Sequence, residues 1–240
     1  MPRPFRPPSV VTLLTNPELE RSGVVANNRM NRERLLVGPN GYDKELGFNP
    51  VQLLRQKAAS SECVRWLDLC CGSGRALIDA AHIVHAEKLD PTIKIIGVDL
   101  VGVFSPVSTE LSCLRFIEAS LTSWRPEKLF DLISCVHGLH YIGDKLGLIQ
   151  QAASWLKVNG QFVTNLSLEN VKFQDGSPAS RCVATELRKA GLLYDGRRKR
   201  LVCDGYKRVE LPFRYLGADD QPGPNYTGQP AVDSYYEWLA

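Results

Sequence analysis

Four short, almost entirely apolar runs of sequence constrain the fold of this chain most strongly. They are VRWLDL at residues 64–69, IKIIGVDL at 93–100, LRFI at 114–117 and FDLISCV at 130–136. A strand covered by helices on both faces loses the alternation of apolar and polar side chains, so these runs indicate buried parallel strands. Between the first two runs, apolar residues recur at helical spacing at Ala76, Leu77, Ala80, Ile83 and Val84. A strand, a helix and a second parallel strand are therefore expected.

The same alternation continues toward the C-terminus. Asp144 can cap a helix with one apolar face, and a fifth strand is expected at residues 161–166. Another helical run at residues 180–190 precedes two β-like stretches, 198–205 and 208–218, which we expect to pair with each other. Alternating strands and helices predict an α/β fold with a Rossmann-like, seven-stranded, mostly parallel sheet, helices on both faces and an antiparallel last strand pair.

The first sixty residues differ from the rest of the chain. They contain few long apolar runs, many polar residues and a turn-rich GPNGY segment at residues 38–42. We therefore expect residues 1–60 to form an N-terminal cap or lid over an α/β domain that comprises residues 61–240. Arg29 and Arg32 in this segment are candidates either to bind a substrate carboxylate or to pair with nearby glutamates.

Charge and cysteine content narrow the class of protein. The chain has 29 Lys and Arg against 26 Asp and Glu, and this net charge of +3 does not indicate a nucleic-acid or membrane partner. The seven cysteines form no C-x-x-C pair and are expected to be reduced thiols. No stretch approaches a secretory signal or the roughly 18 apolar residues of a membrane span. A soluble cytoplasmic protein is expected.

The chemistry is expected in the loop where the first strand meets the first helix. This loop reads Asp68-Leu69-Cys70-Cys71-Gly72-Ser73-Gly74. Ligands collect at the carboxyl ends of parallel strands, and Gly72 and Gly74 let a ligand lie against the backbone. Asp99 ends the second strand, where a carboxylate can accept both hydroxyls of a ribose. An adenosine-containing ligand fits this arrangement.

These residues resemble class I S-adenosylmethionine-dependent methyltransferases of the small-molecule type. DLCCGSG matches the loop after their first strand, GVDL the acidic end of their second, and LRFIEASL and FDLISCVHGLHYIGD the third and fourth strand segments. The resemblance covers residues 64–166 and implies that S-adenosyl-L-methionine is the cofactor. Residues 61–240 would then be the methyltransferase domain, with a C-terminal tail at the substrate pocket.

The resemblance also implies the cofactor contacts. The amino-acid half would be held by Asp68, Cys70, Gly72, Ser73 and Gly74, the ribose by Asp99, and the adenine end by Leu100, Ser120 and Leu121. Two positions depart from the usual pattern. Cys70 occupies a common glycine position, and Ser120 stands where an aspartate often accepts the adenine amino hydrogen.

A nicotinamide dinucleotide site is an alternative for the same loop. That fingerprint requires G-x-G-x-x-G and an acidic residue about 20 positions further on. Here Leu77 occupies the third glycine position, and Asp99 lies further along the chain. The sequence therefore favours the methyltransferase.

Candidate catalytic residues follow the fourth strand. A base near the transferred methyl group helps when the acceptor is a hydroxyl or a protonated amine, and histidine suits neutral pH. We expect His140 to be that base, with His137 second, although such a histidine also commonly only orients a loop. Tyr42 is expected to lie over the sulfonium. No metal is expected, since His82 and His85 are better explained as a solvated helix face.

The predicted activity is methyl transfer to oxygen or nitrogen of a small molecule. An RNA or protein methyltransferase and a non-catalytic cofactor-binding fold remain alternatives. The run Arg197-Arg198-Lys199-Arg200 is a candidate RNA contact or an exposed hairpin edge. In the C-terminal tail, aromatic residues are expected either to line the pocket or to pack on the sheet edge; they are Tyr226, Tyr235, Tyr236 and Trp238.

Overall fold

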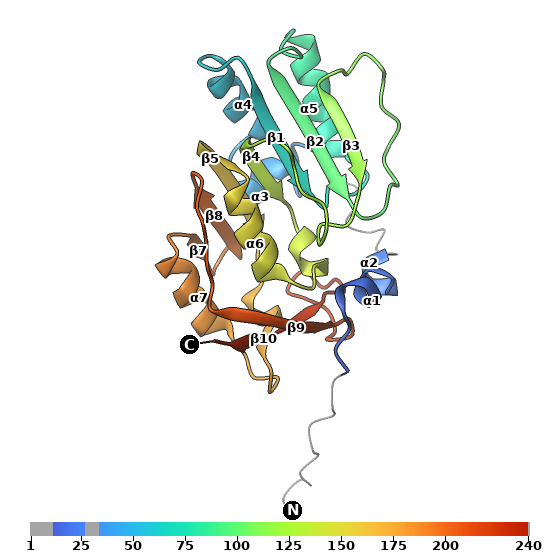
Figure 1. Cartoon of the computed structure of the whole chain (residues 1–240). Coiled ribbons are helices and arrows are strands. Elements are labelled where there is room, and N and C mark those ends of the chain that lie inside the picture. The colour runs from blue at the N-terminus through green and yellow to red at the C-terminus, as the bar shows by residue number, and fades with distance from the viewer. Residues whose placement is uncertain (1–11, 27–33, 240) are drawn as a thin grey trace, which may run out of the picture.

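A seven-stranded sheet forms the centre of the molecule (Figure 1). The computed structural model describes residues 12–26 and 34–239. The strands lie in the order β3-β2-β1-β4-β5-β8-β7. Their bounds are β1 Val64–Leu69, β2 Ile93–Asp99, β3 Leu114–Glu118, β4 Phe130–Cys135, β5 Leu156–Asn165, β7 Leu193–Asp195 and β8 Arg200–Asp204. All neighbours pair parallel except those of β8, which is antiparallel to β5 and β7. The predicted α/β fold is confirmed.

Helices cover both faces of this sheet. On one face pack α3 (Tyr42–Leu46), α4 (Pro50–Ala58) and α5 (Arg75–Ala86), and on the other α6 (Lys145–Ser154) and α7 (Ser180–Lys189). Trp66 in β1 belongs to the first core and the adjacent Leu67 to the second, and both are fully buried. Because neighbouring side chains of β1 enter opposite cores, the strand has no polar face.

The molecule has a second, three-stranded sheet, which takes one of the two C-terminal strands expected in the main sheet. Residues 208–218 do not pair with residues 198–205; their strand β9 (Phe213–Asp219) joins β10 (Asp233–Trp238) and β6 (Val171–Phe173) instead. After β8, Gly205 turns the chain with a φ of 73°. The following backbone N–H groups bond to Lys157, Ala153 and Gln150, and so the chain leaves the edge of the main sheet.

The N-terminal helices α1 (Asn16–Glu20) and α2 (Gly23–Ala26) lie beside this second sheet. The Leu14 backbone exchanges two hydrogen bonds with Ala218, and Leu19 is buried against Ala218 and Val232. The arrowheads of β1, β2 and β3 point toward α1 and α2 (Figure 1). Helices from the start of the chain therefore stand at the carboxyl ends of the central strands.

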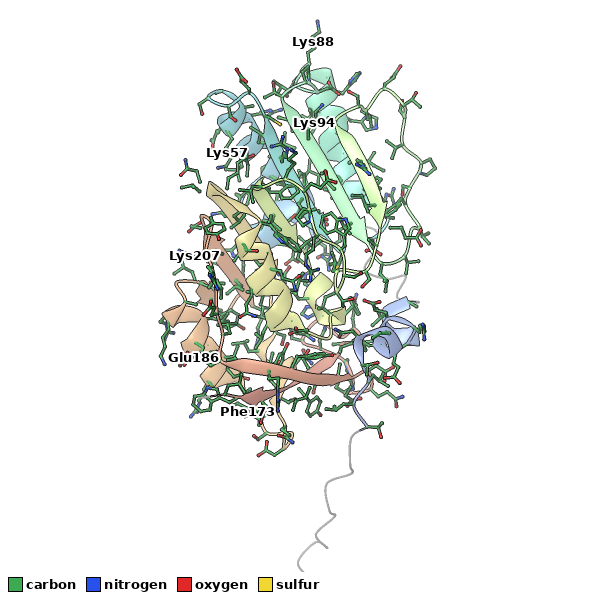
Figure 2. All side chains as sticks on the ribbon, viewed as in Figure 1. Lys57, Lys88, Lys94, Phe173, Glu186 and Lys207 are labelled. Carbon is green, nitrogen blue, oxygen red and sulfur yellow. The ribbon has the colours of Figure 1, made fainter. Side chains whose placement is uncertain are left out.

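The opposite end of the sheet is a solvated surface. Lys57, Lys88 and Lys94 lie at this end, far from α1 and α2 (Figure 2).

Across residues 12–26 and 34–239, no helix is long and apolar enough to cross a bilayer.

Candidate active site

The loop after β1 is sharply turned. Cys70, Gly72 and Gly74 all have positive φ angles, of 57°, 61° and 77°. Gly74 is required for two reasons: its positive φ strains other residues, and a Cβ added there would collide with the Phe116 ring. The non-glycine Cys70 is accommodated because Gly138 lies against it, where any Cβ would overlap the Cys70 side chain. The Cys70 side chain therefore packs directly against the backbone of Gly138, after the end of β4.

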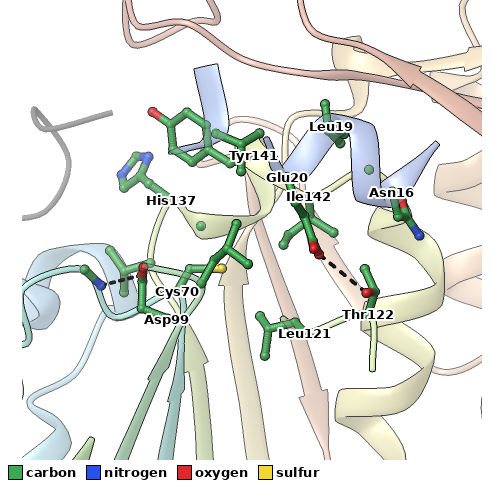
Figure 3. Close-up of a pocket in the computed structure, with 16 residues that line it drawn as sticks. Asn16, Leu19, Glu20, Cys70, Asp99, Leu121, Thr122, His137, Tyr141 and Ile142 are labelled. Atoms are coloured by element: carbon green, nitrogen blue, oxygen red, sulfur yellow. Dashed lines mark hydrogen bonds between the residues drawn. The ribbon is translucent and has the colours of Figure 1, made fainter. Parts of the chain in front are cut away.

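Asp99 joins this loop to the end of β2. Its Oδ2 accepts the Gly72 N–H at 2.8 Å, and its Oδ1 accepts the Val101 N–H at 3.0 Å. Figure 3 shows the Asp99 carboxylate at the wall of a pocket, bonded to the loop. The sequence analysis predicts that Asp99 and Gly72 bind the same ligand, and the structure places these two residues in contact.

Asp68 lies beneath the loop, completely buried. Its Oδ2 accepts the Tyr42 hydroxyl at 2.7 Å, and its Oδ1 accepts the Ser134 hydroxyl. Burial raises the pKa of Asp68 to about 7, although both hydroxyl donors oppose that rise. The Tyr42 ring is itself buried, edge-on to Trp66. Tyr42 therefore contacts Asp68 from below, and its ring is not on the wall of the pocket.

The pocket lies at the carboxyl ends of the central strands. The empty space within it, counted together with the solvent at its open mouth, is about 780 Å³. Six expected site residues line it: Cys70, Gly72, Asp99, Leu100, Leu121 and His137. The other six expected site residues are not among those that line the pocket; they are Asp68, Ser73, Gly74, Ser120, Tyr42 and His140.

The same pocket has walls that sequence reasoning missed. These are Asn16, Leu19, Glu20 and Val25 from α1 and α2, Thr122 after β3, and Val136, Gly138, Tyr141, Ile142 and Gly143 after β4. The hydrogen bond from the Thr15 N–H to the Glu18 carboxylate marks the start of α1, and the T-x-x-E pattern was a usable signal for that helix. Nothing local in the sequence indicated that α1 reaches the end of β3.

A polar cluster surrounds His137. The His137 Nε2 atom lies 3.0 Å from Oε1 of Glu45 in α3. Oε2 of the same carboxylate accepts the Asn165 side-chain amide at 3.0 Å, and the Arg34 guanidinium is 3.5 Å from Oε1. Burial raises the pKa of Glu45, but His137, Arg34 and Asn165 more than offset that effect and leave the pKa below its usual value. Glu45 is thus an ionised partner for the imidazole.

His140 stands behind His137 in the short helix η1 (Gly138–Tyr141). Its Nε2 lies 3.4 Å from Nδ1 of His137. Burial, together with the charges of His137 and Lys145, lowers the pKa of His140 to about 3. His140 is therefore neutral at physiological pH.

One aromatic residue of the C-terminal tail reaches this cluster. The Tyr226 ring centroid is 5.5 Å from that of His140 and 6.4 Å from that of His137. Tyr235 and Tyr236 are instead buried in β10, and Trp238 ends that strand, half-exposed. The tail thus contributes one ring to the site and the others to the second sheet.

Acidic and thiol side chains do not gather into a metal centre in the part of the chain that the structure describes. His85 on α5 lies 3.2 Å from Asp90, on an exposed surface. Arg29 and Arg32, the candidate substrate contacts, lie outside the described residues.

Sequence comparison settles the family. A profile described as a methyltransferase domain matches residues 28–203, most of the chain. The chain belongs to this methyltransferase family. Its domain is an S-adenosylmethionine-dependent methyltransferase domain, as the motifs implied, and S-adenosylmethionine is its cofactor. No curated protein sequence matches the chain.

Several solved structures show partial similarity to this methyltransferase. YjhP from E. coli is 17% identical with a TM-score of 0.38, and the match covers 59% of this chain and 54% of that one. The amino pentose methyltransferase CalS10 from Micromonospora echinaspora is 16% identical with a TM-score of 0.38, covering 52% and 50%. Coclaurine N-methyltransferase is 15% identical with a TM-score of 0.35, covering 48% and 34%. The matches span about half of the length of the first two proteins.

The residues of the pocket fit S-adenosylmethionine. With the cofactor bound, Asp99 would offer its carboxylate oxygens to the ribose hydroxyls, and Gly72, which has no side chain, would let the cofactor lie against the loop. Leu100 and Leu121 supply apolar surface on the same wall.

Proposed function

We propose that this methyltransferase transfers a methyl group to an oxygen or nitrogen atom of a small molecule, with His137 as the base. One observation carries the proposal: His137, held by the ionised Glu45, stands on the wall of a pocket that Asp99 and Gly72 also line. The base and the cofactor contacts thus share one cavity.

The protein contributes alignment and exclusion of water. S-adenosylmethionine, when bound, supplies a methyl group on a positively charged sulfur, which departs with the electron pair of the sulfur–carbon bond. Leu19, Val25 and Ile142 give the pocket apolar walls opposite the loop after β1. Such walls exclude water and hold two reactants in line, which supplies much of the rate enhancement in displacement reactions.

His137 is suited to take the acceptor's proton. Glu45 lies against Nε2 of the imidazole, and Nδ1 has a long 3.4 Å contact with Nε2 of His140, which the acceptor replaces when it binds. The acceptor forms its bond to the methyl carbon, and its O–H or N–H proton passes to Nδ1. The resulting imidazolium is stabilised by the Glu45 carboxylate. This arrangement reverses the order expected from the sequence, because a His140 with a pKa of about 3 is too weak a base at neutral pH. His140 is proposed to position the His137 ring through the contact of its Nε2 with Nδ1 until the acceptor takes that place.

The walls around the proposed base support a small acceptor. Residues of α1 and α2 line the pocket, and the centroid of the Tyr226 ring lies 6.4 Å from that of His137. An RNA or protein substrate would require an open surface beside the base.

The basic run at the β7–β8 turn also argues against an RNA substrate. Arg198 lies 3.4 Å from Asp195, Lys199 2.7 Å from Glu169, and Arg200 donates to the Leu46 carbonyl oxygen. Two of the four cations thus have a carboxylate partner, which reduces the charge available for phosphate groups, and a third is held by a backbone carbonyl.

The test is a search for methylated product. Purified enzyme, S-adenosylmethionine and fractionated metabolite pools should yield S-adenosylhomocysteine and a metabolite heavier by one CH₂ unit. Saturating RNA should give neither product nor salt-sensitive binding. If the enzyme binds S-adenosylhomocysteine but methylates no metabolite and does methylate RNA or protein, the small-molecule proposal is wrong.

A further inference from the structure

We propose that Glu20 in α1 accepts the adenine amino hydrogen of the cofactor, which makes the N-terminal helix part of the cofactor site. The proposal rests on the S-adenosylmethionine dependence given above. It assigns the adenine contact to a residue that precedes residue 28, where the match to the family begins.

Glu20 stands where the adenine end of the pocket is expected. Asp99 and Leu100 mark the ribose end after β2, and Leu121 and Thr122 line the adjoining wall after β3. The Glu20 side chain descends from α1 toward Thr122, above Leu121 (Figure 3). A planar base that extends from a ribose at Asp99 along Leu100 and Leu121 therefore presents its edge to Glu20.

Hydrogen bonds hold the Glu20 carboxylate at the end of β3. Ser120 Oγ donates to Glu20 Oε1 at 2.5 Å, and Thr122 Oγ1 donates to the same oxygen at 3.4 Å. Within residues 12–26 and 34–239, the second oxygen, Oε2, receives no hydrogen bond. One oxygen is thus fixed by β3, and the other is available to a donor in the pocket.

This contact resolves the departure at Ser120. By resemblance, an acidic residue at that position accepts the adenine amino hydrogen, but Ser120 donates its own hydroxyl hydrogen to Glu20. A carboxylate is a stronger acceptor than a hydroxyl because it carries the negative charge. The carboxylate at the end of β3 thus comes from α1 instead of from β3 itself.

The position of α1 is fixed independently of the pocket. The Leu14 N–H donates to the Ala218 carbonyl oxygen at 2.7 Å, and the Ala218 N–H returns a bond to Leu14 at 3.0 Å. Leu19, the neighbour of Glu20, is only 1% exposed. Because Leu19 is anchored in the apolar cluster on the second sheet, the adjacent Glu20 is held over the end of β3.

Selectivity for the 6-amino group follows from this geometry. An adenine presents N–H donors at position 6, whereas the hypoxanthine of S-inosylhomocysteine presents a carbonyl oxygen there, which a carboxylate repels. Titration calorimetry of the full chain with both compounds should show at least about tenfold tighter binding of S-adenosylhomocysteine. Glu20→Gln, whose amide can donate to a carbonyl, should weaken S-adenosylhomocysteine about tenfold and strengthen S-inosylhomocysteine.

A rescue and a matched control sharpen the test. Ser120→Asp in the Glu20→Gln background returns a carboxylate to the end of β3 and should restore the preference for adenine. Glu18→Gln changes a fully exposed carboxylate on the same helix and keeps a residue that can complete the capping box. It should leave both affinities unchanged.

The possible outcomes distinguish the role of Glu20 from the assignment of the cofactor. If Glu20→Gln leaves both affinities within about twofold of wild type while Asp99→Ala weakens S-adenosylhomocysteine, then Glu20 is not the adenine contact and the methyltransferase assignment stands. The proposal is also wrong if adding Ser120→Asp to Glu20→Gln leaves the affinities for both compounds as they are in Glu20→Gln alone. If wild type binds neither compound, the cofactor assignment itself is wrong.

Discussion

Glu45 Oε1 lies 3.0 Å from His137 Nε2, although one residue belongs to α3 near the start of the chain and the other follows β4. The contact holds Nε2 of the imidazole, while Nδ1 faces Nε2 of His140 at 3.4 Å and is the nitrogen proposed to take the acceptor's proton. It is also the feature of the site that mutation can test most directly.

Glu45→Gln should lower kcat about 10- to 100-fold, because a neutral amide stabilises the imidazolium of His137 less well than a carboxylate. The affinity for S-adenosylhomocysteine should change little. Steady-state kinetics and calorimetry on the same preparation measure both quantities. Glu62→Gln, which changes an exposed glutamate two residues before β1, is the control. A Glu45→Gln enzyme with unchanged kcat would remove Glu45 from the mechanism.

His137→Asn should lower kcat more than His140→Asn does. The pKa of His140, lowered to about 3 by burial, keeps this side chain from taking up a proton at neutral pH, so its loss affects only the position of the His137 ring. Turnover at saturating cofactor, measured for both variants from pH 6 to 9, gives the comparison. If His140→Asn loses as much turnover as His137→Asn with cofactor affinity intact, then His140 is the base.

Asp99→Ala should weaken S-adenosylhomocysteine binding at least tenfold, because it removes the acceptor for the ribose hydroxyls and releases the Gly72 N–H. Calorimetry measures the dissociation constant. Asp175→Ala removes a carboxylate that only caps an exposed turn with Ser177, and it should bind the cofactor like wild type. Unchanged affinity in Asp99→Ala would place the cofactor elsewhere.

Asp68 should make the free energy of unfolding depend on pH. Its pKa is about 7 in the fold and 3.8 in the unfolded chain, so between these values the folded chain keeps a proton that the unfolded chain releases. This contribution is complete below 3.8 and is lost as pH rises to about 7. Asp68→Asn lacks it and should therefore gain stability relative to wild type by roughly 1.4 kcal/mol per pH unit within that window.

Urea unfolding of wild type and Asp68→Asn at several pH values measures this slope. His140 contributes the opposite trend, since its lowered pKa makes stability rise with pH from about 3 to 6.5. Both proteins retain His140, so its contribution cancels in the difference. A difference that is constant across the window would show that Asp68 is ionised in the fold.

Gly74→Ala should destabilise the fold by roughly 2 to 4 kcal/mol, because the new methyl group meets the Phe116 ring at a φ of 77°. Gly176→Ala is the matched control: its φ is 81°, but nothing lies within 4 Å of the added methyl group. It should cost only the backbone penalty of about 1 kcal/mol. Equal losses in urea unfolding would show that the Phe116 ring moves aside freely.

The sequence by itself determined the central unit of this protein. The β1–α5–β2 unit and the loop from Asp68 to Gly74 follow from local apolar periodicity and from glycines at turns, and Asp99 follows because parallel strands end at one edge. These features depend on neighbours in the chain, and a local pattern can specify them.

Only the tertiary structure decided which residues complete the site. Glu45 reaches His137, Glu20 reaches Ser120, and Tyr42 turns inward to Asp68, each across many residues of intervening chain. The strand β9 left the main sheet because its backbone partners lie in other elements. Such contacts form where separately folded elements pack together, and their distances are set by the packing, which no local periodicity in the sequence records.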